Sequence, residues 1–290
     1  MGSKLKKPNW LKIRPSSTQK FTKIKQILKD YSLCTVCTEA HCPNQSECWS
    51  QGHTTFMILG DFCTRSCGFC TVKSGDPGGK IDIGEPDRLA EVVKALDLRY
   101  IVLTSVTRDD LPDGGASHFT RCIRKIKETT PSCRIEVLIP DFNGNCESLR
   151  QVVKAKPDVI SHNVETVEHL QSLVRDNRAS YSKSLKVLEV LKKLDPSMIT
   201  KSSLMLGFGE REVEIIQTMR DLRSVFVDVL TIGQYLQPSP RHTKVKEYVH
   251  PKDFERFKEI GYNLGFIYVV SGPFVRTSYQ AGELFSKIIS

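Results

Sequence analysis

The sequence predicts an α/β fold built as a partial (β/α)6 barrel, and two patterns lead to this prediction. First, six short apolar segments alternate with amphipathic helical segments, which is typical of a parallel sheet with right-handed crossovers. Second, polar residues recur where these strands end, namely Thr104, Ser105, Asn163, Glu165 and Gln234. Because active sites of β/α barrels lie at the carboxyl ends of the strands, a barrel is favoured over an open doubly wound sheet.

The expected elements follow along the chain. Strands are expected at 55–59, 100–104, 134–139, 159–162, 200–206 and 227–232. Helices are expected, from apolar residues at helical spacing, at 21–31, 86–97, 115–129, 146–155, 181–194, 210–222 and 251–264. Residues 34–54 are expected to form a cysteine-rich loop. The chain therefore divides into an N-terminal segment at 1–54, a barrel at 55–235 and a C-terminal extension at 236–290.

Composition and charge narrow the possible functions. The 290 residues are 39% hydrophobic and 26% charged, and no apolar run is long enough to span a bilayer. The net charge of +9 lies entirely within residues 1–29, because the rest of the chain has 33 basic and 33 acidic residues. These nine basic residues are Lys4, Lys6, Lys7, Lys12, Arg14, Lys20, Lys23, Lys25 and Lys29. A solubilising arm, a docking arm for an acidic protein, a nucleic-acid contact and a transit peptide are alternatives, of which nucleic acid is disfavoured.

The cysteines point to metal binding. Seven of the ten cysteines lie between residues 34 and 70, whereas a secreted disulfide scaffold would be short and rich in cysteine throughout. Such clustering favours a metal site in a reducing compartment, and hence a cytoplasmic protein that does not enter a membrane.

The second cysteine triplet, Cys63, Cys67 and Cys70, has the spacing C-x3-C-x2-C. Three thiolates so close together can hold one corner of a cubane iron–sulfur cluster and leave the fourth iron open to a substrate or cofactor. Zinc is the alternative, but a closed structural zinc site requires four ligands.

This spacing, placed just after the first expected strand, resembles the radical S-adenosylmethionine (SAM) superfamily. The resemblance implies that the open iron binds SAM and that one electron from the cluster cleaves SAM to a 5′-deoxyadenosyl radical. Such a radical removes hydrogen from unactivated C–H bonds, which amino-acid side chains cannot do alone.

The first triplet, Cys37, Cys42 and Cys48, has the spacing C-x4-C-x5-C and resembles the auxiliary-cluster motif of the lipoyl synthase family. The resemblance extends over nearly the whole chain. Matching segments lie at 7–12, 56–60, 104–111, 113–116, 136–142, 162–166, 233–238 and 276–279.

The resemblance to lipoyl synthases implies the following chemistry. Two sulfur atoms are inserted at C6 and C8 of an octanoyl chain on a lysine of a carrier protein, either a lipoyl domain or an H protein. Each insertion uses one SAM, the auxiliary [4Fe–4S] cluster supplies the sulfur, and ferredoxin or flavodoxin supplies electrons. Ser278, in the C-terminal Arg-Thr-Ser-Tyr motif, corresponds to the fourth ligand of that cluster and to a catalytic residue.

Two other function classes remain as alternatives. One is a different sulfur-inserting radical SAM enzyme that acts on a small molecule. The other is an electron carrier with two clusters, which would need neither SAM nor a barrel of this size.

Several further residues are candidate cofactor contacts, and each also has a structural explanation. Asn163 and Glu165 resemble the family's cofactor contacts, although such residues at a strand end also cap helices. Arg178 and Lys201 are candidate partners for the SAM carboxylate, because cations pair with carboxylates, or else they are structural. Cys34 is interpreted as a bystander to the first cluster.

Overall fold

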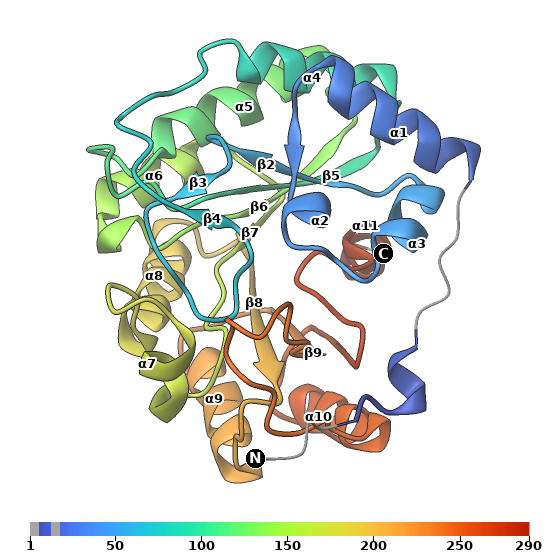
Figure 1. The fold of residues 1–290 in the computed structure, drawn as a ribbon. Coiled ribbons are helices and arrows are strands. Elements are labelled where there is room, and N and C mark those ends of the chain that lie inside the picture. The colour runs from blue at the N-terminus through green and yellow to red at the C-terminus, as the bar shows by residue number, and fades with distance from the viewer. Residues whose placement is uncertain (1–5, 13–17, 290) are drawn as a thin grey trace.

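A computed structural model describes residues 6–12 and 18–289, and its core is one curved sheet (Figure 1). The sheet has the strand order β1-β2-β5-β6-β7-β8-β9-β10. All neighbouring strands from β2 to β10 are parallel, and the short β1 pairs antiparallel with β2. The strand bounds are β1 Cys34–Thr35, β2 Thr55–Ile58, β5 Tyr100–Ser105, β6 Arg134–Leu138, β7 Val159–Ser161, β8 Ile199–Leu206, β9 Val229–Gln234 and β10 Tyr268–Gly272.

The predicted partial barrel is confirmed, and it continues one strand further than expected. All six expected strands are present, and β10 adds a seventh parallel strand beside β9. Its apolar run, Tyr268 to Val270, follows helix α10 (Pro251–Asn263), so the α10–β10 pair repeats the crossover pattern of the preceding units. The segment expected to be a C-terminal extension therefore contributes to the sheet.

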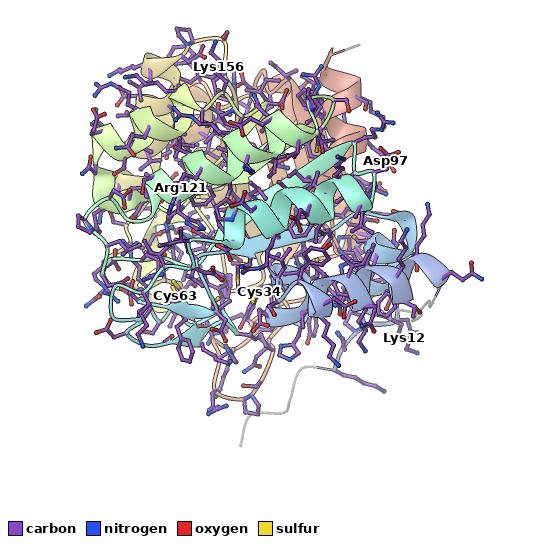
Figure 2. The ribbon with its side chains drawn as sticks, turned by 90° about the horizontal axis from the view of Figure 1, so that it is seen from above. Lys12, Cys34, Cys63, Asp97, Arg121 and Lys156 are labelled. Carbon is purple, nitrogen blue, oxygen red and sulfur yellow. The ribbon has the colours of Figure 1, made fainter. Side chains whose placement is uncertain are left out.

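Helices cover the outer face of the sheet. Their bounds are α4 Glu85–Ala95, α5 Ala116–Thr129, α6 Cys146–Lys154, α8 Tyr181–Leu194 and α9 Glu212–Ser224. Helices α4 and α5 lie side by side (Figure 2). Each presents an apolar stripe to the strands; in α5 the stripe includes Phe119, Ile123 and Ile126, all fully buried. In the described part of the chain, no helix is long and apolar enough to cross a membrane.

The cysteine-rich segment contains short helices where a loop was expected. The N-terminal region comprises the 3-10 turn Asn9–Leu11, α1 Gln19–Asp30, α2 Val36–Glu39 and α3 Gln45–Gln51. The Thr35 side chain caps α2 by accepting a hydrogen bond from the Thr38 N–H (3.3 Å). Gly52 ends α3 in the left-handed conformation, at φ 89°. Helices α2 and α3 are only one or two turns long, and such short segments do not show a helical periodicity in the sequence.

The C-terminal helix α11 (Ala281–Ile289) covers the amino-terminal edge of the sheet. Its Phe285 ring lies 5.6 Å from the ring of Tyr100 and 5.8 Å from the Arg134 guanidinium. Its Lys287 ammonium lies 5.9 Å from the ring of Tyr268. Because these three partners are the first residues of β5, β6 and β10, α11 crosses the base of the barrel.

Candidate active site

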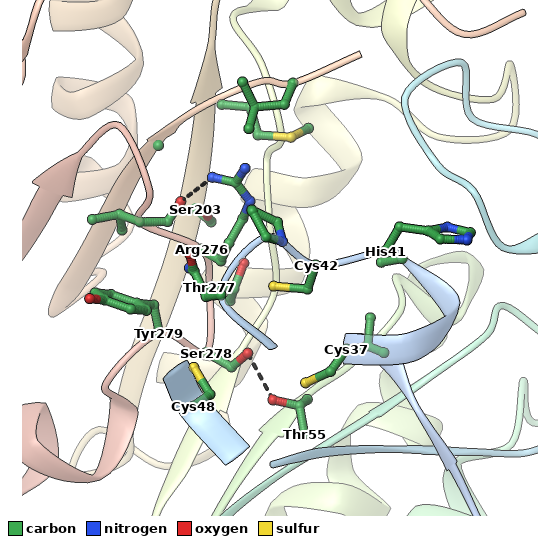
Figure 3. A pocket seen from close by; sticks show the side chains of 18 of the residues that line it. Cys37, His41, Cys42, Cys48, Thr55, Ser203, Arg276, Thr277, Ser278 and Tyr279 are labelled. Atoms are coloured by element: carbon green, nitrogen blue, oxygen red, sulfur yellow. Dashed lines mark hydrogen bonds between the residues drawn. The ribbon is translucent and has the colours of Figure 1, made fainter. Parts of the chain in front are cut away.

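A cavity of about 470 Å³ lies inside the barrel and extends to the first cysteine triplet (Figure 3). This volume is within the range typical of small-molecule sites. Its lining includes barrel residues, N-terminal residues and C-terminal residues. These include Tyr100, Val102, Leu138, Asn163, Glu165, Ser203, Met205, Cys37, Cys42, Cys48, Thr55, Cys70, Arg276, Thr277 and Ser278. The cavity thus brings together three segments that are far apart in the sequence.

The first cysteine triplet is held by the local folding of α2 and α3. Cys37 lies in α2, Cys42 lies in the following turn and Cys48 lies in α3. The Cys42 N–H donates to the Cys37 carbonyl (3.0 Å), and the Cys48 N–H donates to the Asn44 carbonyl (2.9 Å). These bonds fold the segment compactly, so that all three cysteines line one cavity.

Ser278 lies in the same cavity as the first triplet. Figure 3 shows the three cysteine side chains gathered around it. The Thr55 hydroxyl, at the start of β2, donates to Ser278 Oγ (2.9 Å). The C-terminal segment is also attached to α3, because the Tyr279 hydroxyl donates to Glu47 Oε1 (3.0 Å). The structure therefore brings together all four predicted ligands of the auxiliary cluster.

Gly233, in β9, permits this approach of the C-terminal segment. A Cβ atom at this position would collide with the Val275 carbonyl oxygen. A side chain there would displace the chain just before Arg276 and Ser278.

In the second triplet, Cys63 ends the short strand β3 (Phe62–Cys63), and Cys67 and Cys70 lie on the loop that leads to its paired strand β4 (Lys73–Ser74). Arg65, in this loop, is almost fully buried and bonds to two carboxylates, with 2.9 Å to Asp109 and 2.7 Å to Asp141. Both carboxylates follow the carboxyl ends of barrel strands. The loop is therefore fixed against the face of the barrel where active sites of this architecture lie.

Backbone groups hydrogen-bond to the thiols of the second triplet. The N–H groups of Arg65 and Thr107 each lie 3.4 Å from Cys63 Sγ. The Asp176 N–H lies 3.3 Å from Cys67 Sγ. Such hydrogen bonds stabilise sulfur when it carries negative charge, and around cluster sulfurs they tune the reduction potential.

Burial governs the protonation of the cysteines. Desolvation raises the pKa of Cys37 to about 11, and it raises the pKa values of Cys48 and Cys70 to about 12. Without metal these thiols are therefore protonated at neutral pH, and binding a metal centre releases their protons. Among the described residues, no three His, Cys, Asp or Glu side chains are arranged to hold a single metal ion.

Asn163 and Glu165, which the sequence suggests as cofactor contacts, both line the cavity. Asn163 Nδ2 donates to Glu165 Oε1 (3.1 Å) and to Thr277 Oγ1 (2.9 Å). Asn163 Oδ1 is buried and has no hydrogen-bond partner within the protein. Desolvation raises the pKa of Glu165. A buried acceptor without a partner, on a residue that lines a cavity, is suited to a donor on a bound ligand.

Comparison with known proteins agrees with this geometry. The model of the radical SAM superfamily matches residues 57–222. The lipoyl synthase of Methanocella arvoryzae is 54% identical over 98% of this chain and 96% of its own length. The lipoyl synthase of Caldicellulosiruptor saccharolyticus is 54% identical over 98% of this chain and 99% of its own length. That of Ectopseudomonas mendocina is 50% identical over 97% and 80%.

The chain belongs to the lipoyl synthase family. It is thus a radical SAM enzyme, and the cofactors implied by this family are SAM and [4Fe–4S] clusters.

Solved structures agree on the fold alone. Methylornithine synthase (PylB) has a TM-score of 0.56 at 12% identity and covers 75% of this chain and 71% of its own. The FeFe-hydrogenase maturase HydG from Carboxydothermus hydrogenoformans has a TM-score of 0.58 at 12% identity, with 92% and 77% covered.

The residues of this lipoyl synthase family member fit those cofactors in three respects. Each cysteine triplet is a soft-donor set of the kind that iron–sulfur clusters take. Backbone donors already point at two of the thiols in the second triplet. Asn163, whose buried Oδ1 has no partner within the protein, lines the same cavity as Cys70.

Two predicted cofactor contacts lie away from the cavity wall. Lys201 is fully buried inside the barrel and pairs with Glu136 (2.9 Å). Arg178 bonds to Asp176 (2.9 Å) and lies near Asp109 (3.3 Å), beside the loop of the second triplet. Both arginine and lysine are therefore already neutralised by carboxylates of the protein.

Cys34 lies outside the cavity of the first triplet. It begins β1 and pairs with Met57 of β2, and its pKa is raised chiefly by desolvation. This placement agrees with its interpretation as a bystander.

Arg276 is a site residue that the sequence did not single out beyond its motif. It lines the cavity, and its Nη1 donates to the Val275 carbonyl (2.7 Å). Across residues 6–12 and 18–289 we find no carboxylate paired with it, and desolvation lowers its pKa. An unpaired guanidinium beside Cys42 places positive charge where an anionic cluster would be held. The family motif was the only signal in the sequence that could have indicated this residue.

Proposed function

We propose that the enzyme converts a protein-bound octanoyl-lysine to the lipoyl cofactor by inserting sulfur at C6 and C8. The observation that supports this most strongly is the meeting of Cys37, Cys42, Cys48 and Ser278 in one cavity with Asn163 and Cys70. A sulfur source, a cofactor site and space for an acyl chain would then adjoin one another.

The two triplets have different assigned roles in this proposal. Cys63, Cys67 and Cys70 would hold the cluster that binds SAM and supplies the electron for its cleavage. Cys37, Cys42, Cys48 and Ser278 would hold the auxiliary cluster, which is a substrate that donates sulfur. A serine oxygen is a harder and weaker ligand for iron than a thiolate, which suits a cluster that must come apart.

Residues of the chain would position the reactants. Asn163, through its open Oδ1, would accept a hydrogen bond from SAM. Arg276 would balance the negative charge of the auxiliary cluster. The apolar wall of Val102, Leu138 and Met205 would exclude water from the acyl carbons, so that a radical formed there reacts with sulfur and not with solvent.

The carrier protein is proposed to bind at the cavity beside Lys7, a residue of the basic arm. Lys7 is exposed and lines the cavity, and the adjacent Trp10 packs against His250 at a ring distance of 5.2 Å. Lys4 and Arg14 of the same arm lie outside the described residues. The arm would then attract an acidic octanoylated lipoyl domain or H protein.

Salt tests this docking role. We expect the KM for the carrier to rise with ionic strength, and Lys7→Glu to raise it further at low salt. An unchanged KM in both cases would remove the docking role and leave the solubilising arm.

Two further parts of the proposal concern the cellular setting. A ferredoxin or flavodoxin would supply electrons. All ten cysteines are free, which is typical of a reducing compartment such as the cytoplasm.

Mass analysis of the carrier tests the proposed function. The reconstituted enzyme is incubated with octanoylated carrier, SAM and a reductant. We expect a carrier that is heavier by two sulfur atoms as the dithiol, and lighter by two hydrogen atoms once air oxidises the dithiol to the cyclic disulfide. Formation of 5′-deoxyadenosine without a change in the carrier would favour a radical enzyme acting on a small molecule, and absence of 5′-deoxyadenosine would favour an electron carrier.

A further inference from the structure

We propose that Tyr100 and helix α11 form the closed end of the cavity and set the length of the acyl chain that the enzyme accepts. This inference rests on the proposed function, because it assumes an acyl substrate in the cavity. It assigns Tyr100 as a residue that determines chain-length specificity.

Tyr100 lies where the cavity meets the base of the barrel. It is the first residue of β5, it lines the cavity, and its ring packs against Phe285 of α11 at 5.6 Å. Ala281 and Gly282, at the start of α11, also line the cavity, and Gly282 lies against Tyr100. The cavity therefore ends at this ring and this helix.

A buried polar cluster holds the Tyr100 ring in place. The Tyr100 hydroxyl donates to Glu136 Oε2 (2.8 Å). Glu136 also pairs with Lys201 (2.9 Å) and accepts from the Ser161 hydroxyl (2.8 Å). Glu136, Lys201 and Ser161 are all fully buried. If the ring swung aside, the fully buried glutamate would lose a hydrogen-bond partner, which is unfavourable.

Helix α11 supports the ring from the other side. A Cβ atom at Gly282 would lie 3.1 Å from Tyr100 Cβ and 3.3 Å from Tyr100 Cγ. The helix backbone is therefore in close contact with the tyrosine, and the floor cannot move outward unless the helix leaves the barrel.

The cavity wall next to Tyr100 is apolar. Val102 projects from the same face of β5 as Tyr100, two residues along the strand, and Leu138 and Met205 also line the cavity. The open polar groups, Asn163 Oδ1 and the Arg276 guanidinium, belong to strand ends and to the C-terminal motif. An alkyl chain would therefore place its methyl end toward Tyr100, with its attachment to the carrier toward the mouth.

Chain length follows from this geometry. Each methylene buried against the wall raises affinity about fourfold, until the chain reaches the ring. A longer chain would have to displace Tyr100 from Glu136 and α11 from the barrel.

The experiment compares hexanoyl, octanoyl and decanoyl carriers on the reconstituted wild-type enzyme, Tyr100→Ala and Tyr100→Phe. The readouts are the Kd of each acyl carrier and its sulfur insertion. For the wild type we expect octanoyl to bind about sixteenfold more tightly than hexanoyl, and decanoyl to bind more weakly than octanoyl. For Tyr100→Ala we expect decanoyl to bind at least as tightly as octanoyl.

Tyr100→Phe is the matched control, because it keeps the ring and removes only the bond to Glu136. Because α11 still supports the ring, this variant should keep the wild-type order of chain lengths, with a smaller difference between octanoyl and decanoyl than in the wild type. A Tyr100→Ala variant that folds and still binds octanoyl more tightly than decanoyl would overturn the proposal.

A second variant tests the role of the cavity floor in chain-length preference if Tyr100→Ala does not fold. Val102→Phe fills space above the floor and should shift the preference from octanoyl to hexanoyl; an unchanged preference would again overturn the proposal. Failure of the proposed function would be recognised separately, as a wild-type enzyme that inserts no sulfur into octanoyl carrier at all.

Discussion

The hydroxyl of Thr55, at the start of the first barrel strand, donates a 2.9 Å hydrogen bond to Ser278 near the end of the chain. This bond joins the barrel to the C-terminal motif at the point where the first cysteine triplet gathers. The auxiliary site is therefore built from three segments, namely α2–α3, β2 and residues 276–279.

The two cysteine neighbours Cys34 and Cys37 should differ sharply in their effect on iron content. We expect Cys37→Ala to lower the iron bound after reconstitution from about eight to about four atoms per chain, because one of two four-iron clusters loses a ligand. The matched control Cys34→Ala should retain about eight, since Cys34 lies outside the cavity. Equal iron loss in the two variants, measured by metal analysis, would count against the assignment of the first triplet.

Removal of the Asn163 side chain should weaken SAM binding. Its open Oδ1 atom is the proposed acceptor, and one hydrogen bond contributes about 1 kcal/mol, so Asn163→Ala should raise the Kd for SAM roughly fivefold to tenfold. Thr277→Val removes only the partner of Asn163 Nδ2 and should have a smaller effect. Equilibrium binding of SAM to the reconstituted enzyme measures both. An unchanged Kd in Asn163→Ala would show that the open acceptor serves another purpose.

Arg65 should be important for stability as well as for the cluster loop. Arg65→Met would leave Asp109 and Asp141 without their buried cation, and we expect the free energy of unfolding to fall by about 3 kcal/mol or more. Arg99→Met, which breaks an ion pair with 70% and 78% of its side chains exposed, is the control and should show no measurable change. Denaturant titration of the metal-free chain distinguishes them, and similar losses in both variants would contradict this account.

The buried His162 should make the unfolding free energy depend on pH. It is completely buried, its ring nitrogens lie 3.0 Å from the Ile139 carbonyl and from Ser184 Oγ, and desolvation lowers its pKa to about 4. Arg175 lowers this pKa further, whereas Asp141 opposes the shift. Between about pH 4 and pH 6.5 the unfolded chain therefore binds a proton that the folded chain does not, so stability rises with pH and then levels off.

The size of this effect is about 3 kcal/mol across that window. Burial raises the pKa of Glu165 and of Glu210, which acts in the opposite direction, so the comparison must be with a His162→Gln variant. We expect the variant to be less stable at pH 7 but to lose less stability on acidification. Parallel pH curves for the two proteins would mean that His162 is not the responsible group.

Much of the barrel was predictable because its strands are short apolar runs separated by amphipathic helices. Strand β10 was not predicted, because Tyr268 to Val270 is short and its parallel partner, β9, is visible only in three dimensions. Helices α2 and α3 were not predicted either, because each is one or two turns long and depends on caps such as Thr35 and Gly52.

Site residues that belong to a sequence motif were predictable. Site residues whose roles depend on contacts with distant parts of the chain were not. The spacing of the first cysteine triplet and the Arg-Thr-Ser-Tyr motif indicated Cys37, Cys42, Cys48 and Ser278, which line one cavity. Lys201, by contrast, resembles a cofactor contact in the sequence, but in the fold it pairs with Glu136 two strands away. Ion pairs between strands depend on the order and register of those strands. The residue pattern along a single segment gives neither the order nor the register.

We propose that Cys37, Cys42, Cys48 and Ser278 hold a cluster that is a substrate of the reaction. The most direct test is to reconstitute the enzyme with sulfide enriched in ³⁴S and to measure the mass of the carrier by mass spectrometry after one turnover in unlabelled buffer. We expect both inserted sulfur atoms to be ³⁴S, and we expect Cys37→Ala to insert none. Insertion of unlabelled sulfur, or insertion by the Cys37→Ala variant, would contradict the claim.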